Sequence, residues 1–252
     1  MIDLHSHILP GLDDGPPSVD ESLEMARVAT ASGTRAIATT SHVNTGYGIA
    51  IEELEAAREA LAARFAGEDI GLELLAGGEI APSRLPELDD DELRRISLGG
   101  GPYVLLECPF SPVGSGMGPM VDDLRRRGFE VLLAHPERSP SFQREPQRLA
   151  GLIERGALAQ VTSGSLAGAF GGVAQAVAEM MLHKGLVHVL ASDAHDPAHR
   201  SPDLRLAFSA VGEDQFEWMT SAAPAAILAG EPLPPRPPLP RRRGLLKRLT
   251  GS

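Results

Sequence analysis

Seven short apolar segments recur along the chain, and helix-like stretches separate them. They begin near residues 2, 34, 70, 104, 130, 157 and 186. The run Val131–Ala134 is apolar at every position, which indicates a strand covered on both faces. Strands that alternate with helices in this way predict an α/β fold with a parallel sheet. With 252 residues, the chain is long enough for one large domain with a substantial core.

Helix boundaries can be placed from capping signals. Ser18 followed by Glu21 matches a capping box, and Gly33 marks the end of that helix. Two further stretches, 144–155 and 213–228, are each predicted to form one helix.

Side chains that can bind metals follow the ends of six of the seven strands. A βα-barrel brings the loops after its strands to one rim, where such barrels gather their active sites. We therefore expect these histidines and carboxylates to lie close together. The candidates are His5, His7, Asp14, His42, Glu79, Glu107, His135, Asp193 and His195.

The first strand ends in the motif His5-Ser6-His7. Residues two apart in an extended backbone point to the same face, so both imidazoles can enter one space. An isolated motif of this kind is more often structural, with one ring bonded to the backbone and the other solvated. Here the recurrence of histidines and carboxylates at later strand ends favours a metal site. Asp13 and Asp14 are both candidates for the nearby oxygen ligand, and only geometry can separate them.

The size of the candidate set predicts more than one ion. Nine donors exceed the roughly four to six that one ion takes, so two or three divalent metal ions are expected. Nitrogen and oxygen donors without thiolate suit manganese, iron or zinc, and the residues do not choose among them. Clustered ions of this kind favour hydrolysis, with an activated water attacking a phosphoryl group in line.

Two arginines lie beside the presumed ligands. Arg138 comes three residues after His135, and Arg200 comes five after His195. A planar guanidinium can hold phosphate oxygens through paired hydrogen bonds, and we predict this role for both. The alternative is that both form surface ion pairs, which contribute little.

The single cysteine, Cys108, excludes an internal disulfide and a cysteine-rich zinc site. Cysteine-based phosphatases carry an arginine six positions after the nucleophile, and here that position is Gly114. Cys108 is therefore expected to pack at a strand end. Among the remaining histidines, we expect His183 and His199 to be solvated and His188 to be packed or paired in the core.

Charge is distributed unevenly. The net charge is −11, but residues 232–252 contribute +6, which leaves an acidic body of −17. An acidic body argues against a nucleic-acid partner. No apolar run is long enough to span a membrane and no signal peptide is recognisable, so the cytoplasm is expected.

The domain is predicted to cover residues 1–230, and residues 231–252 to form a flexible tail. The proline-rich part of this tail should be an extended spacer. The basic stretch 241–249 is interspersed with leucines. It suits either contact with an anionic membrane surface or a disordered solubilising tail.

The ordered set of motifs resembles the polymerase-and-histidinol-phosphatase (PHP) superfamily. More narrowly, it is similar to the bacterial capsule and exopolysaccharide tyrosine-protein phosphatases of the CpsB/YwqE type. The similarity runs from residue 1 to about residue 230. The stretches that carry it are 3–15, 40–42, 78–80, 106–107, 134–138 and 191–195.

This resemblance implies a distorted seven-stranded βα-barrel with a trinuclear site that usually holds manganese. The implied ligands are the nine candidates above, and the implied phosphate-binding residues are Arg138 and Arg200. The implied substrate is phosphotyrosine on the tail of a bacterial tyrosine kinase that controls polysaccharide export, which would place the enzyme at the inner face of the membrane.

Two other functions remain open at this point. One is a small-molecule phosphomonoesterase of the same superfamily, such as a histidinol phosphatase. The other is an inactive PHP-like binding module, which the complete set of candidate ligands argues against. The oligomeric state is not predicted.

Overall fold

The computed structural model describes residues 1–110 and 116–238 of the chain. Strands and helices alternate along it, and every strand pair in this part is parallel. The strands are β1 (Ile2–Ser6), β2 (Ala36–Thr39), β3 (His42–Val43), β4 (Glu73–Leu75), β5 (Glu79–Ile80), β6 (Tyr103–Glu107), β7 (Glu130–Ala134), β8 (Leu158–Thr162) and β9 (Val189–Ala191). The α-helices are α1 (Val19–Ser32), α2 (Ile51–Gly67), α3 (Asp90–Arg95), α4 (Met117–Arg126), α5 (Pro140–Arg144), α6 (Gln147–Glu154), α7 (Ser163–Leu166), α8 (Gly171–His183), α9 (Phe208–Val211), α10 (Glu213–Glu217) and α11 (Ala223–Ala229).

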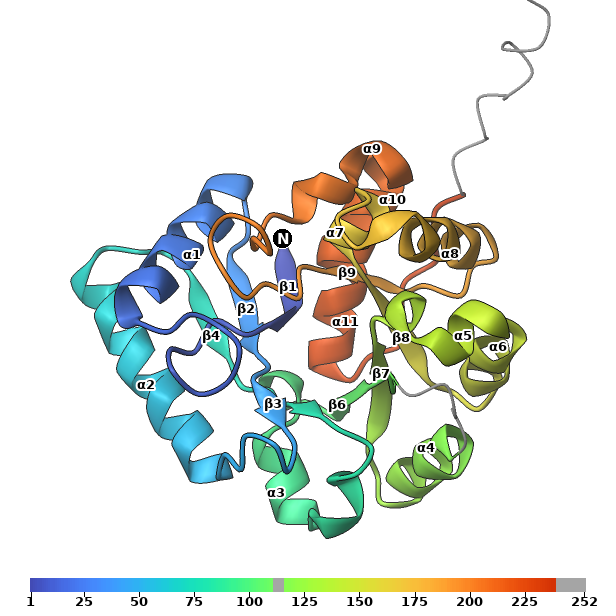
Figure 1. Cartoon of the computed structure of the whole chain (residues 1–252), viewed down its shortest axis with the longest axis horizontal. Coiled ribbons are helices and arrows are strands. Elements are labelled where there is room, and N and C mark those ends of the chain that lie inside the picture. The colour runs from blue at the N-terminus through green and yellow to red at the C-terminus, as the bar shows by residue number, and fades with distance from the viewer. Residues whose placement is uncertain (111–115, 239–252) are drawn as a thin grey trace, which may run out of the picture.

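The strands form two sheets. The first has the order β1-β2-β4, and the second has the order β3-β5-β6-β7-β8-β9. The second and third predicted strands correspond to β2 and β4, whereas β3 and β5 lie beyond their ends and are additional short strands. A parallel bridge between Ser6 and Ala194 links the end of β1 to the segment after β9. The strands thus follow one another around the centre of the molecule, with most helices at its periphery (Figure 1). The predicted α/β class with parallel strands is confirmed.

The predicted N-cap residue and C-terminal glycine of α1 are present. The Ser18 side chain accepts a hydrogen bond from the Glu21 backbone N–H, and Gly33 ends the helix in the left-handed conformation with φ 98°. Leu23, Ala26 and other apolar residues of the same face are buried. Capping and the apolar face therefore fix this helix as the sequence predicts.

Proline, which lacks a backbone donor, changes two of the predicted helices. The stretch 144–155 contains Pro146, which separates α5 from α6. The stretch 213–228 comprises α10, a π-helical segment (Trp218–Ala222) and α11. Ala223 N–H donates to Trp218 O at this point, just before Pro224, which has no N–H to give. The wider turn accommodates that missing donor without ending the helical run.

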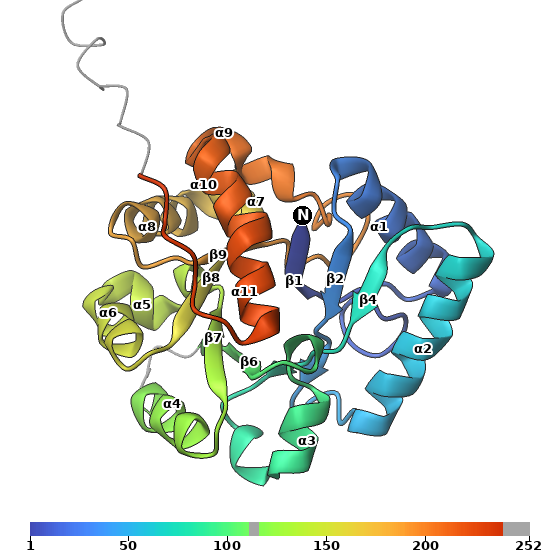
Figure 2. The ribbon, with the colours of Figure 1, turned by 180° about the vertical axis from the view of Figure 1, so that it is seen from behind.

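The first part of the predicted tail is extended, but it contacts the domain. The Trp218 indole N–H donates to Pro234 O at 3.1 Å, and Arg236 lies 5.3 Å from the Trp218 ring centroid. Figure 2 shows this segment running along the side of the molecule that carries α11. The basic stretch 241–249 lies outside the described residues. Within residues 1–110 and 116–238, no helix is both long and apolar enough to cross a membrane.

Candidate metal centre

The structure brings all nine predicted metal-binding side chains to one place. They fall into overlapping groups whose donor atoms lie within 4.8 Å of one another. Because the groups share members, they form one continuous cluster at the ends of the strands. The groups are His7, Asp14, His42 and His195; His5, His7 and Asp193; His5, Glu79 and His135; and His42, Glu79 and Glu107.

Glu79 lies at the centre of the cluster. Its Oε2 is 3.1 Å from His42 Nδ1, 3.4 Å from His7 Nε2 and 3.6 Å from His5 Nε2. Its other oxygen, Oε1, is 2.8 Å from His135 Nε2. Oε2 is buried and has no hydrogen-bond partner among the described residues. A buried carboxylate oxygen left without a donor but surrounded by imidazole nitrogens fits a cation better than a hydrogen-bond network.

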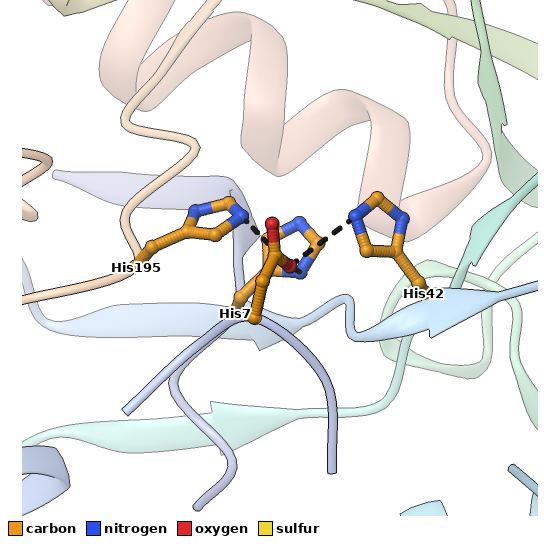
Figure 3. Close-up of side chains that lie close together, drawn as sticks. His7, His42 and His195 are labelled. Carbon is orange, nitrogen blue, oxygen red and sulfur yellow. Dashed lines mark ion pairs between the residues drawn. The ribbon is translucent and has the colours of Figure 1, made fainter. Parts of the chain in front are cut away.

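Asp14 lies on the side of the cluster formed by His42 and His195. Its Oδ1 lies 3.4 Å from His42 Nε2 and 3.3 Å from His195 Nε2. Figure 3 shows His7, His42 and His195 converging, with these two ion pairs drawn as dashed lines. The rings of His7 and His195 are stacked, with centroids 3.9 Å apart. One carboxylate thus faces several imidazoles from separate strand ends.

Asp13 has a different role from its neighbour Asp14. Its Oδ2 lies 2.8 Å from His7 Nδ1 and accepts the His42 backbone N–H at 2.9 Å. This bond holds the His7 proton on Nδ1, so that the Nε2 lone pair is directed into the cluster. The geometry therefore places Asp14 in the cluster and Asp13 behind it.

Sequence reasoning missed a second orienting residue, Gln160. Its Oε1 lies 3.0 Å from His5 Nδ1 and also accepts the His135 backbone N–H at 3.3 Å. The signal that could have found it is a polar side chain between apolar neighbours in the middle of a strand, β8. By holding Nδ1 of His5, Gln160 turns Nε2 toward the centre.

Backbone strain is concentrated at the cluster. His135 (φ 35°) and Asp193 (φ 50°) are two of the three described non-glycine residues with positive φ. Such conformations are costly for side chains with a Cβ and persist where surrounding contacts impose them. For Asp193, one such contact is a hydrogen bond from its backbone N–H to His5 O at 2.8 Å.

Asp193 joins the cluster to the two predicted arginines. Its Oδ1 lies 3.4 Å from His5 Nε2, whereas its Oδ2 accepts from Arg200 Nη2 at 2.9 Å and also from Arg138. The Asp193 side chain is only 2% exposed, so these pairs are not the surface ion pairs of the alternative interpretation. The two guanidinium groups lie side by side at the edge of the cluster.

Charge within the cluster is strongly coupled. Burial disfavours protonation of His7, but the nearby carboxylates of Asp13 and Glu79 outweigh it and raise the pKa of His7 to about 9. Burial is outweighed in the same way at His42, where Asp14 and Glu79 raise the pKa to about 10. Burial and the charge of Glu79 raise the pKa of Glu107. A metal ion entering the cluster must displace the imidazole protons, so its binding depends on pH.

The cluster opens into a cavity of 120 Å³. Larger hollows exist, among them one of 600 Å³ beside Trp218, but none of them contains a group of converging histidines and carboxylates among the described residues. The converging histidines and carboxylates, rather than the volume of the hollow, identify the site. The lining residues are Asp14, His42, Glu79, Glu107, Phe110, His135, Arg138, Asp193, His195 and Arg200.

Other residues singled out from the sequence lie apart from this chemistry. Cys108 is buried in the apolar core, and burial raises the pKa of its thiol well above the usual range, which opposes a nucleophilic thiolate. His188 Nδ1 accepts the Ala159 backbone N–H at 3.1 Å, as expected of a paired histidine. The His199 side chain is 94% exposed.

Comparison with known proteins points in one direction. The family model described as "Capsular polysaccharide synthesis, CpsB/CapC" matches residues 1–229. The chain is 36% identical to the tyrosine-protein phosphatase YwqE of Bacillus subtilis over 249 residues, which is 96% of this chain and 97% of that protein. It is 30% identical to the putative tyrosine-protein phosphatase CapC of Staphylococcus aureus over 213 residues, 83% of this chain and 82% of that one.

A solved structure agrees with these sequence matches. It is described as YwqE from Bacillus subtilis and CpsB from Streptococcus pneumoniae, unique metal-dependent tyrosine phosphatases. It superposes with a TM-score of 0.86 at 35% identity, covering 96% of this chain and 100% of that chain.

Proposed function

This chain belongs to the CpsB/CapC family of capsular polysaccharide synthesis, and on that premise we propose that it is a metal-dependent protein-tyrosine phosphatase. The observation that carries the proposal is the convergence of nine histidine and carboxylate side chains from separate strand ends. YwqE, to which the chain is 36% identical over nearly its whole length, is named a tyrosine-protein phosphatase. The buried, inaccessible Cys108 supports chemistry that does not depend on a cysteine nucleophile.

The cluster is proposed to hold two or three divalent ions, with manganese as the resident metal and iron or zinc as alternatives. The donor set contains only imidazole nitrogen and carboxylate oxygen, which suits these ions. When bound, the ions supply an activated water for in-line attack and neutralise charge on the phosphoryl oxygens. The proposed ligands are His5, His7, Asp14, His42, Glu79, Glu107, His135, Asp193 and His195.

Arg138 and Arg200 are proposed to hold the phosphoryl group. Both line the cavity and both are bonded to Asp193 Oδ2, so their guanidinium groups are already oriented before substrate binds. Remaining N–H groups of each fork can donate to phosphoryl oxygens in the geometry that guanidinium groups favour. Their positive charge also stabilises the additional negative charge of the transition state.

The leaving group is consistent with the residues available. A tyrosine phenolate has a pKa of about 10, so it departs more readily than an alkoxide and has less need of a general acid. Among the described residues, every ionisable side chain in the cavity lining is already proposed as a metal ligand or as a phosphoryl-binding arginine, so none is left as a dedicated proton donor. A site of this composition therefore suits aryl phosphomonoesters.

The proposed substrate is phosphotyrosine on the tail of a bacterial tyrosine kinase that regulates capsule or exopolysaccharide synthesis. The family description, capsular polysaccharide synthesis, supports this assignment. The cytoplasm, at the inner face of the membrane, is the proposed location. The basic stretch 241–249 is proposed as a peripheral membrane contact, although it lies outside the described residues. Binding of the full chain to vesicles with and without anionic lipid tests that contact.

A comparison of two substrates tests the function. The protein is stripped of metal with a chelator, one part is reloaded with manganese, and each part is given a phosphotyrosine peptide and histidinol phosphate. We expect manganese-dependent hydrolysis of the peptide. His42→Ala and Asp193→Ala should abolish it, because each removes a donor from the centre of the cluster.

Other results would change the assignment. Activity that chelation leaves unaffected would contradict metal-dependent hydrolysis. A strong preference for histidinol phosphate would favour a small-molecule phosphatase of the same superfamily. Hydrolysis of neither substrate by the reloaded protein would favour an inactive binding module.

A further inference from the structure

The cavity at the cluster is too small for a whole phosphotyrosine side chain. Its volume is 120 Å³, whereas pockets that enclose small organic ligands measure about 300–1,000 Å³. Nine of its ten lining residues are ionisable, and their groups suit the phosphoryl group and metal ions. The organic part of the ester must therefore lie at the mouth of the cavity.

Among the described residues, Phe110 is the one apolar member of that lining. It follows the end of β6, and its ring centroid lies 5.6 Å from that of His135. The residue is nevertheless 48% exposed. A single exposed phenylalanine is unremarkable on a protein surface. This one, however, borders the cavity into which the phosphoryl group must enter.

A second phenylalanine, Phe170, occupies a different position. The Arg138 guanidinium carbon lies 4.3 Å from the Phe170 ring centroid and 5.4 Å from that of Phe110, so Arg138 contacts both rings. Arg200 lies 5.8 Å from the Phe170 ring. Phe170 thus contacts both arginines and is not in the cavity lining. Its position suits support of the arginines rather than contact with the substrate.

We propose that Phe110 is a specificity-determining residue that packs against the aromatic ring of an aryl phosphomonoester. This inference rests on the proposed phosphatase function and deepens it. With the phosphoryl group held by Arg138 and Arg200, the esterified ring leaves the cavity beside Phe110. Two aromatic rings in contact gain from offset or edge-to-face packing, which an alkyl ester cannot match. Phe170 is a positioning residue, which acts on both ester classes through the arginines.

Replacement of Phe110 by leucine isolates the ring, because leucine keeps an apolar side chain at the same place. Non-hydrolysable phenylphosphonate and cyclohexylphosphonate provide a direct comparison, since they share size and headgroup. For Phe110→Leu, we expect the dissociation constant of phenylphosphonate to rise about ten-fold relative to that of cyclohexylphosphonate. KM for a phosphotyrosine peptide should rise similarly while kcat changes little. Phe110→Trp should restore both the dissociation constant of phenylphosphonate and KM for the peptide.

Two further variants serve as controls. Phe208 is also exposed, at 41%, but it lines a separate hollow beside Trp218. Phe208→Leu should therefore leave the dissociation constants of both phosphonates unchanged. Phe170→Leu should weaken the binding of phenylphosphonate and cyclohexylphosphonate equally, because Phe170 acts through the arginines.

The outcomes separate this inference from the proposed function. The inference alone would be overturned if the wild-type protein hydrolyses phosphotyrosine but Phe110→Leu leaves the affinity for both phosphonates unchanged. The same holds if Phe110→Leu lowers the affinity for both phosphonates equally. Wild-type protein with no manganese-dependent hydrolysis of the peptide would overturn the proposed function.

Discussion

The neighbouring residues Asp13 and Asp14 should respond differently to the same substitution. Asp14 Oδ1 faces His42 and His195 in the cluster, whereas Asp13 Oδ2 lies against His7 Nδ1. Asp14→Ala should therefore lower the number of metal ions bound. Asp13→Ala should leave that number unchanged and weaken the affinity, because His7 loses the partner that orients it.

The expected size of the Asp13 effect follows from its contacts. The carboxylate accepts from His7 Nδ1 at 2.8 Å, from His42 N at 2.9 Å and from Gly15 N at 3.0 Å. Loss of an orienting partner of a metal-bound histidine typically costs ~10–100-fold in affinity. Since alanine removes all three acceptor contacts, we expect the upper end of that range, about 100-fold or ~2.7 kcal/mol.

Asp13→Asn provides a graded second variant. Its amide oxygen can still accept from His7 and His42, while its NH₂ group faces the Gly15 N–H, where a donor meets a donor. The orientation of His7 is then kept, while the negative charge and the hydrogen bond from Gly15 N–H are lost. We expect a loss of affinity of about ten-fold, between wild type and Asp13→Ala.

Isothermal titration calorimetry of the metal-free proteins with manganese measures both quantities. Thermal unfolding of each variant checks that the fold is intact. Lower stoichiometry in Asp13→Ala with normal stoichiometry in Asp14→Ala would refute the assignment of roles. So would unchanged affinity in Asp13→Ala.

Three further predictions concern residues around the site and in the core. Arg138→Lys should lower kcat/KM for a phosphotyrosine peptide by about ten-fold or more with unchanged manganese stoichiometry, because lysine lacks the planar fork; equal kcat/KM values would contradict this role. Burial lowers the pKa of His188 to about 4, so the unfolded chain takes up this proton first as pH falls below about 6.5. Stability should therefore decrease from pH 6.5 to pH 4, by about 2 kcal/mol after allowance for partial exposure. Urea unfolding of His188→Asn, which keeps an acceptor for the Ala159 N–H, should lack this part of the slope, and an unchanged slope would contradict it. Cys108→Ser should leave kcat nearly unchanged, and a large loss without loss of manganese would reopen a role for the thiol.

The position of the candidate site could be predicted because it depends on a regular feature. Parallel strands place their carboxyl ends on one rim, so residues as distant as His5 and His195 were expected together, and the structure brings them together. Their binding of metal stays a prediction. Asp13 and Asp14 could not be distinguished, because they lie in a turn-rich loop whose course is set by contacts with residues far along the chain, such as the His42 N–H.

The irregular parts of the fold were less predictable. The short strands β3 and β5 lie beyond the ends of the predicted strands, and the sequence pattern does not indicate that they pair with each other. The π-helical segment before Pro224 maintains one helical run, although proline more commonly ends or kinks a helix. Gln160 carries a visible signal, a polar residue in a buried strand, but its partner His5 is 155 residues away.

The central claim is that one cluster binds several ions through side chains from separate strand ends. Anomalous diffraction from a crystal of the manganese-loaded protein tests it most directly. We predict two or three manganese peaks in the cluster, with Glu79 contacting more than one of them. The reason is that Glu79 Oε2 lies near imidazole nitrogens that belong to several of the donor groups. A single ion, or ions bound elsewhere while these nine side chains bind none, would contradict the account.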